Sequence, residues 1–232
     1  MERAIHMDKS SRAKIIAFEG IDGSGKGVQF NSIYHILTSK GANVGKMDFP
    51  AYDEFFGREI GRMLSGDSSV NANTVDVKSM SLWYAMDRYL AFEKIDLYAY
   101  DYILLNRSTL SNAVYQSARC CDKERQPLME WIEELEFKYL KIPRPDMYVI
   151  FDVPPAQSEI NVAKKGHRDY VGEKADVYEA DKGFMSDVRQ SYLKASKIFD
   201  NAVVINCMGS EGMLPVETIS EMVEQAIRGL NV

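Results

Sequence analysis

The sequence contains few of the residues that form disulfide frameworks and zinc sites. Its 232 residues include three cysteines, Cys120, Cys121 and Cys207, and three histidines that are scattered along the chain. An odd cysteine count with an adjacent pair does not make a disulfide framework, so we expect a reducing compartment and a cytoplasmic protein. No CxxC pair or Cys/His cluster has the spacing of a zinc site.

An excess of positive charge and a long apolar run are also missing. Lys and Arg total 28 and Asp and Glu total 34, which gives a formal net charge of −6. An acidic chain is not attracted as a whole to polyanions, so we expect neither nucleic acid nor a membrane as partner. No apolar run approaches the roughly 18 residues that span a bilayer. The N-terminus lacks the apolar segment of a signal peptide, and we expect residues 1–13 to form a flexible leader before a single domain over 14–232.

Short apolar runs alternate with longer amphipathic segments along the chain. The runs predict strands over residues 14–19, 44–49, 102–105, 147–151 and 203–207. The amphipathic segments predict helices from Gly25 to Gly41 and over 55–64, 74–99 (mostly buried), 110–118, 127–140 (with Pro127 at its start), 156–163, 184–199 and 215–229. This alternation indicates an α/β fold with a five-stranded parallel sheet, which binds ligands beyond the carboxyl ends of its strands. The charged segment 164–182 is expected to be a mobile surface segment.

A glycine-rich motif follows the first predicted strand and precedes the first predicted helix. Gly20-Ile21-Asp22-Gly23-Ser24-Gly25-Lys26 fits GxxxxGK in the context that a phosphate-binding loop requires. Its glycines allow backbone N–H groups to surround phosphate, and Lys26 can reach the β- and γ-phosphates of ATP. The alternative is a glycine-rich turn with a chance lysine. The Ser or Thr that normally holds Mg²⁺ is missing, because Gly27 and Val28 follow Lys26, so magnesium must be held through water by Asp22 or another carboxylate such as Glu19.

Further motifs in the same order along the chain extend this interpretation. They are Phe18 to Lys26, Asp48-Phe49-Pro50-Ala51-Tyr52, Leu82 to Arg88, Asn106 to Gln116, Pro145-Asp146 with Val153-Pro154-Pro155, and Tyr178-Glu179. From Lys14 to the C-terminus the chain resembles the thymidylate kinase family. The resemblance implies a P-loop kinase fold with a mobile lid and the phosphorylation of thymidine monophosphate to the diphosphate, with ATP as co-substrate and Mg²⁺ as cofactor. It also implies a homodimer, for which the predicted 74–99 helix can supply the face.

The resemblance assigns roles to individual residues. It implies that Tyr84 stacks on thymine, that Arg88 binds the 4-carbonyl and that Arg107 binds the acceptor phosphate. The remaining nucleotide-binding residues implied are Ser111, Asn112, Tyr115 and Gln116 at the base and sugar, Phe49 and Tyr52 in the monophosphate loop, and Tyr178. The lid cations are Lys164 and Lys165 for ATP and Arg168 for catalysis, beside the catalytic Lys26, Arg107 and Asp22. The alternatives are a core aromatic for Tyr84, capping or solvated side chains for Ser111 and Asn112, and a solvated charge run for the lid.

The chain departs from the family pattern at further places besides the missing hydroxyl after Lys26. Asn106 stands where the family usually has Asp, and the Phe-Pro segment lacks the usual Arg, for which Arg58 or Arg62 are the nearest substitutes. Two other functions stay open. Asn106-Arg107-Ser108 is faintly similar to the Glu-Arg-Ser of deoxynucleoside kinases, and Gly27-Val28, Asn106 and Ala51 favour a binding protein with little activity. A deoxynucleoside kinase would phosphorylate a nucleoside hydroxyl, and a nucleotide-binding protein of low activity would bind both nucleotides with little turnover.

Overall fold

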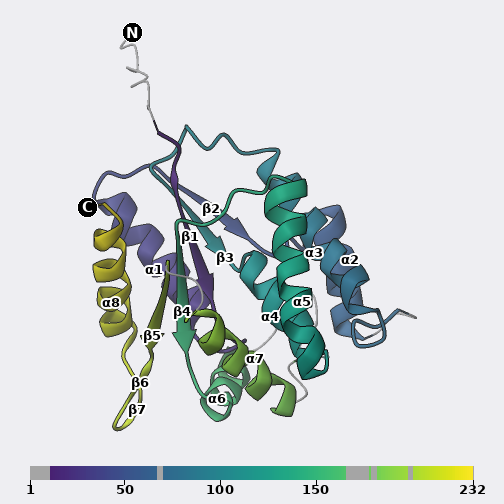
Figure 1. Cartoon of the computed structure of the whole chain (residues 1–232). Helices are drawn as coiled ribbons and strands as arrows, with labels where there is room; N and C mark the ends of the chain where they lie inside the picture. Colours follow the sequence, from purple (N-terminus) through teal and green to yellow (C-terminus); the bar gives the residue numbers. More distant parts are fainter. Residues whose placement is uncertain (1–10, 67–69, 166–177, 179–181, 198–200, 232) are drawn as a thin grey trace.

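The five predicted strands form one parallel sheet (Figure 1). A computed structural model describes residues 11–66, 70–165, 178, 182–197 and 201–231. The strands lie in the order β2 (Val44–Asp48), β3 (Tyr102–Asn106), β1 (Lys14–Glu19), β4 (Met147–Asp152) and β5 (Ala202–Asn206). Every neighbouring pair in this sheet is parallel. The α/β fold class and the five-stranded parallel sheet are confirmed.

Helices cover both faces of the sheet, which explains why its strands are apolar at nearly every position. In β1, Ile16 and Phe18 pack on the face covered by α1 (Lys26–Ser39) and α8 (Val216–Arg228). Ile15 and Ala17 point to the opposite face, which is covered by α4 (Thr109–Ala118) and α7 (Lys182–Ala195). Figure 1 shows the two helix layers on either side of β1.

The remaining elements surround this three-layer core. They are α2 (Phe55–Ser65), α3 (Val77–Phe92), α5 (Asp122–Glu133), the π-helix η1 (Glu134–Tyr139), α6 (Pro155–Lys165), the two-stranded hairpin of β6 (Met208–Gly209) and β7 (Gly212–Met213), and the 3-10 turn η2 (Gly229–Asn231). Within the described ranges, no helix combines the length and the apolar character needed to cross a membrane.

The predicted helices over 127–140 and 74–99 differ most from the structure in their bounds. The helix predicted to begin at Pro127 begins at Asp122, so Pro127 lies inside α5. The prediction gave too much weight to proline as a first helical residue, whereas Asp122 and Glu124 in the first turn already favour an earlier start. The helix predicted over 74–99 is α3, which begins after Asp76 because the Asp76 carboxylate accepts hydrogen bonds from the N–H groups of Lys78 and Ser79. It is also less buried than predicted, since Leu82 and Leu90 are exposed.

The ends of two other predicted segments need correction as well. Arg12 and Ala13 fall within the predicted flexible leader over 1–13. Arg12 forms an ion pair with Asp146 at 2.7 Å, and Ala13 is buried and donates its N–H to the Leu97 carbonyl. Most of the predicted lid over 164–182 lies outside the described residues. Its first two residues belong to α6.

Polar residues gather at one edge of the sheet. Glu19, Asp48, Asn106 and Asp152 end β1, β2, β3 and β4, and parallel strands bring these ends to the same side. The loop from β1 to α1, the start of α6 and the segment between β7 and α8 lie at this edge (Figure 1).

Candidate active site

A cavity of about 450 Å³ opens at the carboxyl edge of the sheet. One end lies against the glycine-rich loop and the start of α1, and the other lies between α3 and α4. The predicted site residues that line it are Asp22, Gly23, Gly25, Lys26, Gly27, Val28, Phe49, Tyr52, Tyr84, Arg88, Arg107, Ser111, Asn112, Tyr115, Gln116 and Tyr178. The structure therefore brings together residues that lie more than 150 positions apart in the sequence.

The glycine-rich loop is held in its shape by backbone geometry and by α6. Gly23 has a φ of 75°, and a Cβ atom at this position would lie 2.4 Å from the Ser158 carbonyl oxygen. The Ser158 hydroxyl donates a hydrogen bond to the Asp22 carbonyl, and the Asn161 amide donates one to the Gly23 carbonyl at 2.8 Å. Gly25, at the N-cap of α1, has a φ of 85°. Only glycine adopts both conformations readily, so the loop is built to bring its backbone close to an anion.

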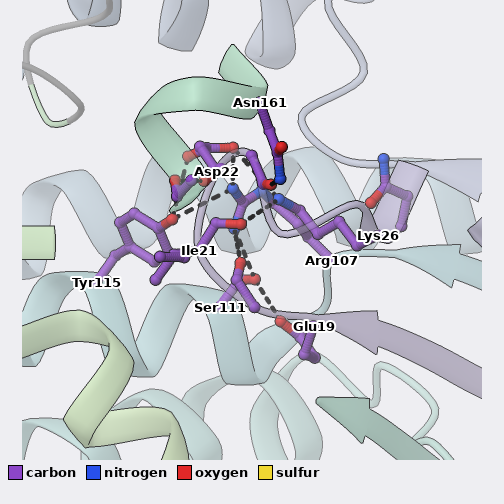
Figure 2. A network of polar contacts seen from close by, with 12 residues as sticks. Glu19, Ile21, Asp22, Lys26, Arg107, Ser111, Tyr115 and Asn161 are labelled. Carbon is purple, nitrogen blue, oxygen red and sulfur yellow. Dashed lines mark hydrogen bonds and ion pairs between the residues drawn. The ribbon is translucent and has the colours of Figure 1, made fainter. Parts of the chain in front are cut away.

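Asp22 is the centre of a charged network in this loop (Figure 2). Its Oδ1 accepts hydrogen bonds from Arg107 Nη2 at 2.5 Å and from Lys26 Nζ at 3.3 Å, and its Oδ2 accepts one from the Tyr115 hydroxyl at 3.1 Å. Burial alone would raise the pKa of the Asp22 carboxyl, but Arg107 and Lys26 outweigh it and hold this pKa well below its usual range. Asp22 is therefore ionised and bridges the two cations that face the cavity.

Arg107 follows β3 in an unusual backbone conformation. Its φ is 68°, in the left-handed region that non-glycine residues rarely adopt. The guanidinium also contacts the Ser111 hydroxyl at 3.3 Å and lies 4.9 Å from the centre of the Tyr115 ring. Backbone strain of this kind is concentrated at functional sites, where the surrounding structure maintains it. This conformation directs a fully charged, fork-shaped donor toward the glycine-rich loop.

The prediction that Glu19 holds magnesium-bound water is not supported. Glu19 is fully buried and does not line the cavity. Its carboxylate accepts hydrogen bonds from the hydroxyls of Ser108 at 2.6 Å, Ser111 at 2.5 Å and Tyr192 at 3.0 Å. The Glu19 carboxylate therefore ties β1 to α4 and α7. Ser111 donates its hydroxyl to Glu19 and also contacts Arg107, so it lies at the end of the cavity that the glycine-rich loop lines.

The donor set suits Mg²⁺ at the same end of the cavity. Magnesium in nucleotide sites keeps several waters and takes one or two carboxylates beside the phosphates. Asp22 and Asp48 both line the cavity, and the buried Oδ1 of Asn106, next to Asp48, has no partner. Asn106 donates its amide Nδ2 to Asp48 Oδ1 at 2.9 Å. The described residues contain no group of three or more His, Cys, Asp and Glu side chains that could enclose a metal ion.

Three unpaired polar atoms are found at the other end of the cavity, between α3 and α4. Arg88 bonds through Nε and Nη2 to Glu136, which leaves its Nη1 without a partner among the residues described. Asn112 Oδ1 and Gln116 Nε2 are buried and have no partner. Asn112 Nδ2 donates to Glu136 and to the Ser81 carbonyl, and Gln116 Oε1 accepts from Arg119 Nη1 at 2.8 Å. These bonds fix both amides, so Asn112 presents an acceptor to the cavity and Gln116 presents a donor.

Several residues that line the cavity were not predicted as site residues, and some predicted site residues lie elsewhere. The additional lining residues are Gln29, Asp48, Pro50, Leu64, Asn106, Asn161, Val162, Met213, Val216 and Ile219. Met213 and Val216 follow β5, so the rule that ligands bind beyond the carboxyl ends of parallel strands was the signal for them. The predicted residues that do not line the cavity are Glu19, Gly20, Ile21, Ser24 and Lys164. Arg168 and the side chain of Lys165 lie outside the described residues. Arg58 and Arg62 do not line the cavity but lie in an adjoining groove, which shares Asp48, Phe49, Pro50 and Tyr52 with it.

Comparison with known proteins gives consistent matches. The family model described as thymidylate kinase matches residues 18–214. The thymidylate kinase of Mycobacterium tuberculosis (strain ATCC 25618 / H37Rv) is 29% identical over 170 residues, which cover 72% of this chain and 78% of that protein. The "Probable thymidylate kinase" of Pyrococcus abyssi is 26% identical over 224 residues, which cover 94% of this chain and 100% of that protein. A solved structure of thymidylate kinase from Candida albicans matches the fold with a TM-score of 0.70 and 19% identity, over 94% of this chain and 92% of that one. The chain belongs to the thymidylate kinase family.

Proposed function

We propose that this chain transfers the γ-phosphoryl group of ATP to thymidine monophosphate and releases thymidine diphosphate and ADP. The observation that carries this proposal is the set of unpaired atoms between α3 and α4. Arg88 Nη1 is a donor, Asn112 Oδ1 an acceptor and Gln116 Nε2 a donor. Asn112 is the central member, because it shares Glu136 with Arg88 and lies one helical turn from Gln116.

This order complements the edge of thymine. Thymine presents an acceptor at O4, a donor at N3–H and an acceptor at O2. Arg88 Nη1 and the two buried atoms, Asn112 Oδ1 and Gln116 Nε2, would each gain a hydrogen bond when thymine binds, and an unpaired buried polar atom is costly. Tyr84 lines the same end of the cavity and can cover the face of the ring.

The opposite end of the cavity suits phosphoryl transfer between two phosphates. Lys26 and Arg107 both face it, and the glycine-rich loop lines it. The acceptor is a phosphate oxygen that is already anionic, so the transfer needs positioning and charge stabilisation more than a strong base. Arg107 would hold the acceptor phosphate and Lys26 the transferred group, which offsets the repulsion between the two anionic substrates.

Magnesium, when bound, would neutralise charge on the ATP phosphates. The residues that would hold it are Asp22 and Asp48, directly or through water, because both carboxylates line the phosphate end. Gly27 supplies no hydroxyl at the position where the loop normally offers one. The ATP base would lie beside Val28, Met213 and Val216, which form an apolar wall next to the loop.

We also propose an oligomeric state and a cellular location for this chain. We expect a homodimer, because Leu82 and Leu90 on α3 and Phe55 on α2 expose apolar surface. A cytoplasmic location is supported by the three free cysteines. We expect no nucleic acid or membrane partner for a chain with a net charge of −6.

The deciding experiment compares thymidine monophosphate and thymidine as acceptors with MgATP, with the products separated by chromatography. We expect the diphosphate to form from the monophosphate and no product from thymidine. Phosphorylation of thymidine alone would make the chain a nucleoside kinase. Binding of both nucleotides in a calorimeter without turnover would make it a nucleotide-binding protein.

A further inference from the structure

A fully buried carboxylate, Glu136, lies directly behind the base end of the cavity. It belongs to η1, the π-helical segment that continues α5, and it does not line the cavity itself. Its Oε1 accepts from Arg88 Nη2 at 2.5 Å and from Asn112 Nδ2 at 2.9 Å. Its Oε2 accepts from Arg88 Nε at 2.7 Å and from Thr109 Oγ1 at 2.6 Å. One carboxylate therefore holds two of the three side chains that face the base.

Glu136 determines which end of the Asn112 amide faces the cavity. The two groups next to Asn112 Nδ2 are the Glu136 carboxylate and the Ser81 carbonyl, at 2.9 and 3.1 Å. Both groups accept hydrogen bonds and neither can donate one. A rotated amide would place its oxygen against two acceptors in a buried environment, which is strongly unfavourable. The Oδ1 acceptor of Asn112 must therefore face the cavity.

Glu136 also fixes the charge and the direction of Arg88. The Arg88 side chain is 2% exposed and the Glu136 side chain 0%, so each needs the other as its counter-ion. Burial opposes the charge on Arg88, but the Glu136 carboxylate outweighs this effect and raises the Arg88 pKa. The bidentate pairing uses Nε and Nη2, and it directs the remaining Nη1 donor to the cavity.

We propose that Glu136 is a positioning residue that makes the cavity selective for pyrimidine nucleotides with an oxo group at C4 and a hydrogen at N3. The proposal rests on the proposed function, which places the base against Arg88 and Asn112. Cytosine reverses both contacts, because its 4-amino group would meet the Arg88 donor and its N3 lone pair would meet the Asn112 acceptor. When an analogue leaves buried polar groups of the site unpaired, it is rejected far more strongly than an analogue that differs only in shape.

The substitution Glu136→Gln tests this role with little change in volume. Glutamine offers one oxygen and one NH₂ group, so only the Ser81 carbonyl still opposes rotation of the Asn112 amide, and the rotated form becomes less unfavourable. Arg88 also loses its charged partner. We expect the KM for thymidine monophosphate to rise about 10- to 100-fold, the effect of losing a charge-assisted contact. The KM for ATP should change less than about threefold, and the preference for thymidine over deoxycytidine monophosphate should fall at least about tenfold.

The chain offers a matched control in Glu133→Gln. Glu133 ends α5, three residues before Glu136, and pairs with Arg144 at 3.5 Å outside the cavity. This control should retain the wild-type KM and the wild-type preference between the two nucleotides. A general loss of folded enzyme lowers the apparent kcat for both nucleotides and leaves their ratio unchanged, so the ratio separates positioning from stability.

A folded E136Q enzyme with wild-type KM and wild-type preference would overturn the proposal, as would an equal loss with both nucleotides. If E136Q does not fold, Thr109→Val removes one of the four hydrogen bonds to Glu136 and keeps the ion pair. It should shift the preference in the same direction by a smaller factor, and an unchanged preference would count against the proposal. If the wild type does not phosphorylate thymidine monophosphate, the proposed function fails. The role of Glu136 can then still be tested by calorimetry, which measures the Kd of both nucleotides. If E136Q keeps the wild-type ratio of these two Kd values, the proposed role of Glu136 is contradicted.

Discussion

Asp22 and Arg107, which are 85 positions apart in the chain, are joined by a hydrogen bond of 2.5 Å between Oδ1 and Nη2. Lys26 donates to the same oxygen at 3.3 Å. A phosphate group in the cavity would compete with Asp22 for these two cations. The carboxylate thus sets the charge that the substrates encounter, and it keeps both cations in place at the edge of the sheet.

The Asp22 contacts predict a pH-dependent contribution to stability. Because the pKa of Asp22 is held well below its usual range, its contribution is complete above the unfolded-state pKa of about 4 and is lost as the pH falls below that value. We expect Asp22→Asn to lower the free energy of unfolding by about 1–3 kcal/mol near neutral pH, because two cations lose a charged acceptor. Urea unfolding of both proteins should show the same difference at about pH 5 and a smaller one at about pH 3. A difference that stays constant over this range would contradict the ionised, paired state of Asp22.

The fork shape of the Arg107 guanidinium leads us to expect that replacement by lysine impairs catalysis. Arg107→Lys keeps the charge and the contact to Asp22, but one ammonium cannot also reach Ser111, Tyr115 and a phosphate in a fork. We expect kcat/KM for thymidine monophosphate to fall about 10²- to 10³-fold, the range for removal of one donor to the reacting group. Steady-state kinetics with Arg62→Lys, an exposed arginine paired with Glu59, provides the control and should give wild-type values. If Arg107→Lys lowers kcat/KM by less than about threefold, Arg107 does not bind the acceptor phosphate.

The parts of the molecule that the sequence predicted are those whose signal is local. Each strand is a short apolar run that glycine, proline or a polar residue ends, and β1 was predicted with its observed bounds. The phosphate loop is also contiguous, so its position between a strand and a helix was readable from the order of residues. The positive φ values of Gly23 and Gly25, 75° and 85°, are local reasons for glycine at these positions.

The parts that the sequence did not predict depend on distant partners. Glu136 lies in the charged segment Glu133-Glu134-Leu135-Glu136, where it looks like one solvated acid among several. Its burial follows from Arg88, 48 positions earlier, and from Thr109 and Asn112 on another helix. Glu19 is the opposite case. Its position at the end of β1 predicted a role at a metal site, but its side chain is fully buried. Three hydroxyl groups from α4 and α7 satisfy its carboxylate instead.

Tyr84 provides a test of how the base is held. Base stacking on an aromatic ring contributes about 1–3 kcal/mol, so Tyr84→Ala should raise the Kd for thymidine monophosphate about 10- to 100-fold. Tyr84→Phe keeps the ring and should stay within about threefold of the wild type. Calorimetric titration measures both constants directly, and thermal unfolding of the same samples separates lost binding from lost packing. Equal affinity in the two variants would show that Tyr84 packs in the core and does not contact the base.

We expect a hydroxyl group introduced at Gly27 to make the enzyme bind magnesium more tightly. It is the second residue of α1, and a Cβ atom at this position would meet no atom within 4 Å. Serine therefore fits, and its hydroxyl would occupy the place where phosphate-binding loops normally hold Mg²⁺. We expect Gly27→Ser to lower the Mg²⁺ concentration needed for half-maximal activity by about threefold or more, as one added charge-assisted contact would. Gly27→Ala is the matched control, because it adds the Cβ and should stabilise α1 by about 0.5–1 kcal/mol without a hydroxyl. If G27S and G27A give the same magnesium dependence as the wild type, the metal lies away from this position and is held by Asp22 and Asp48 alone.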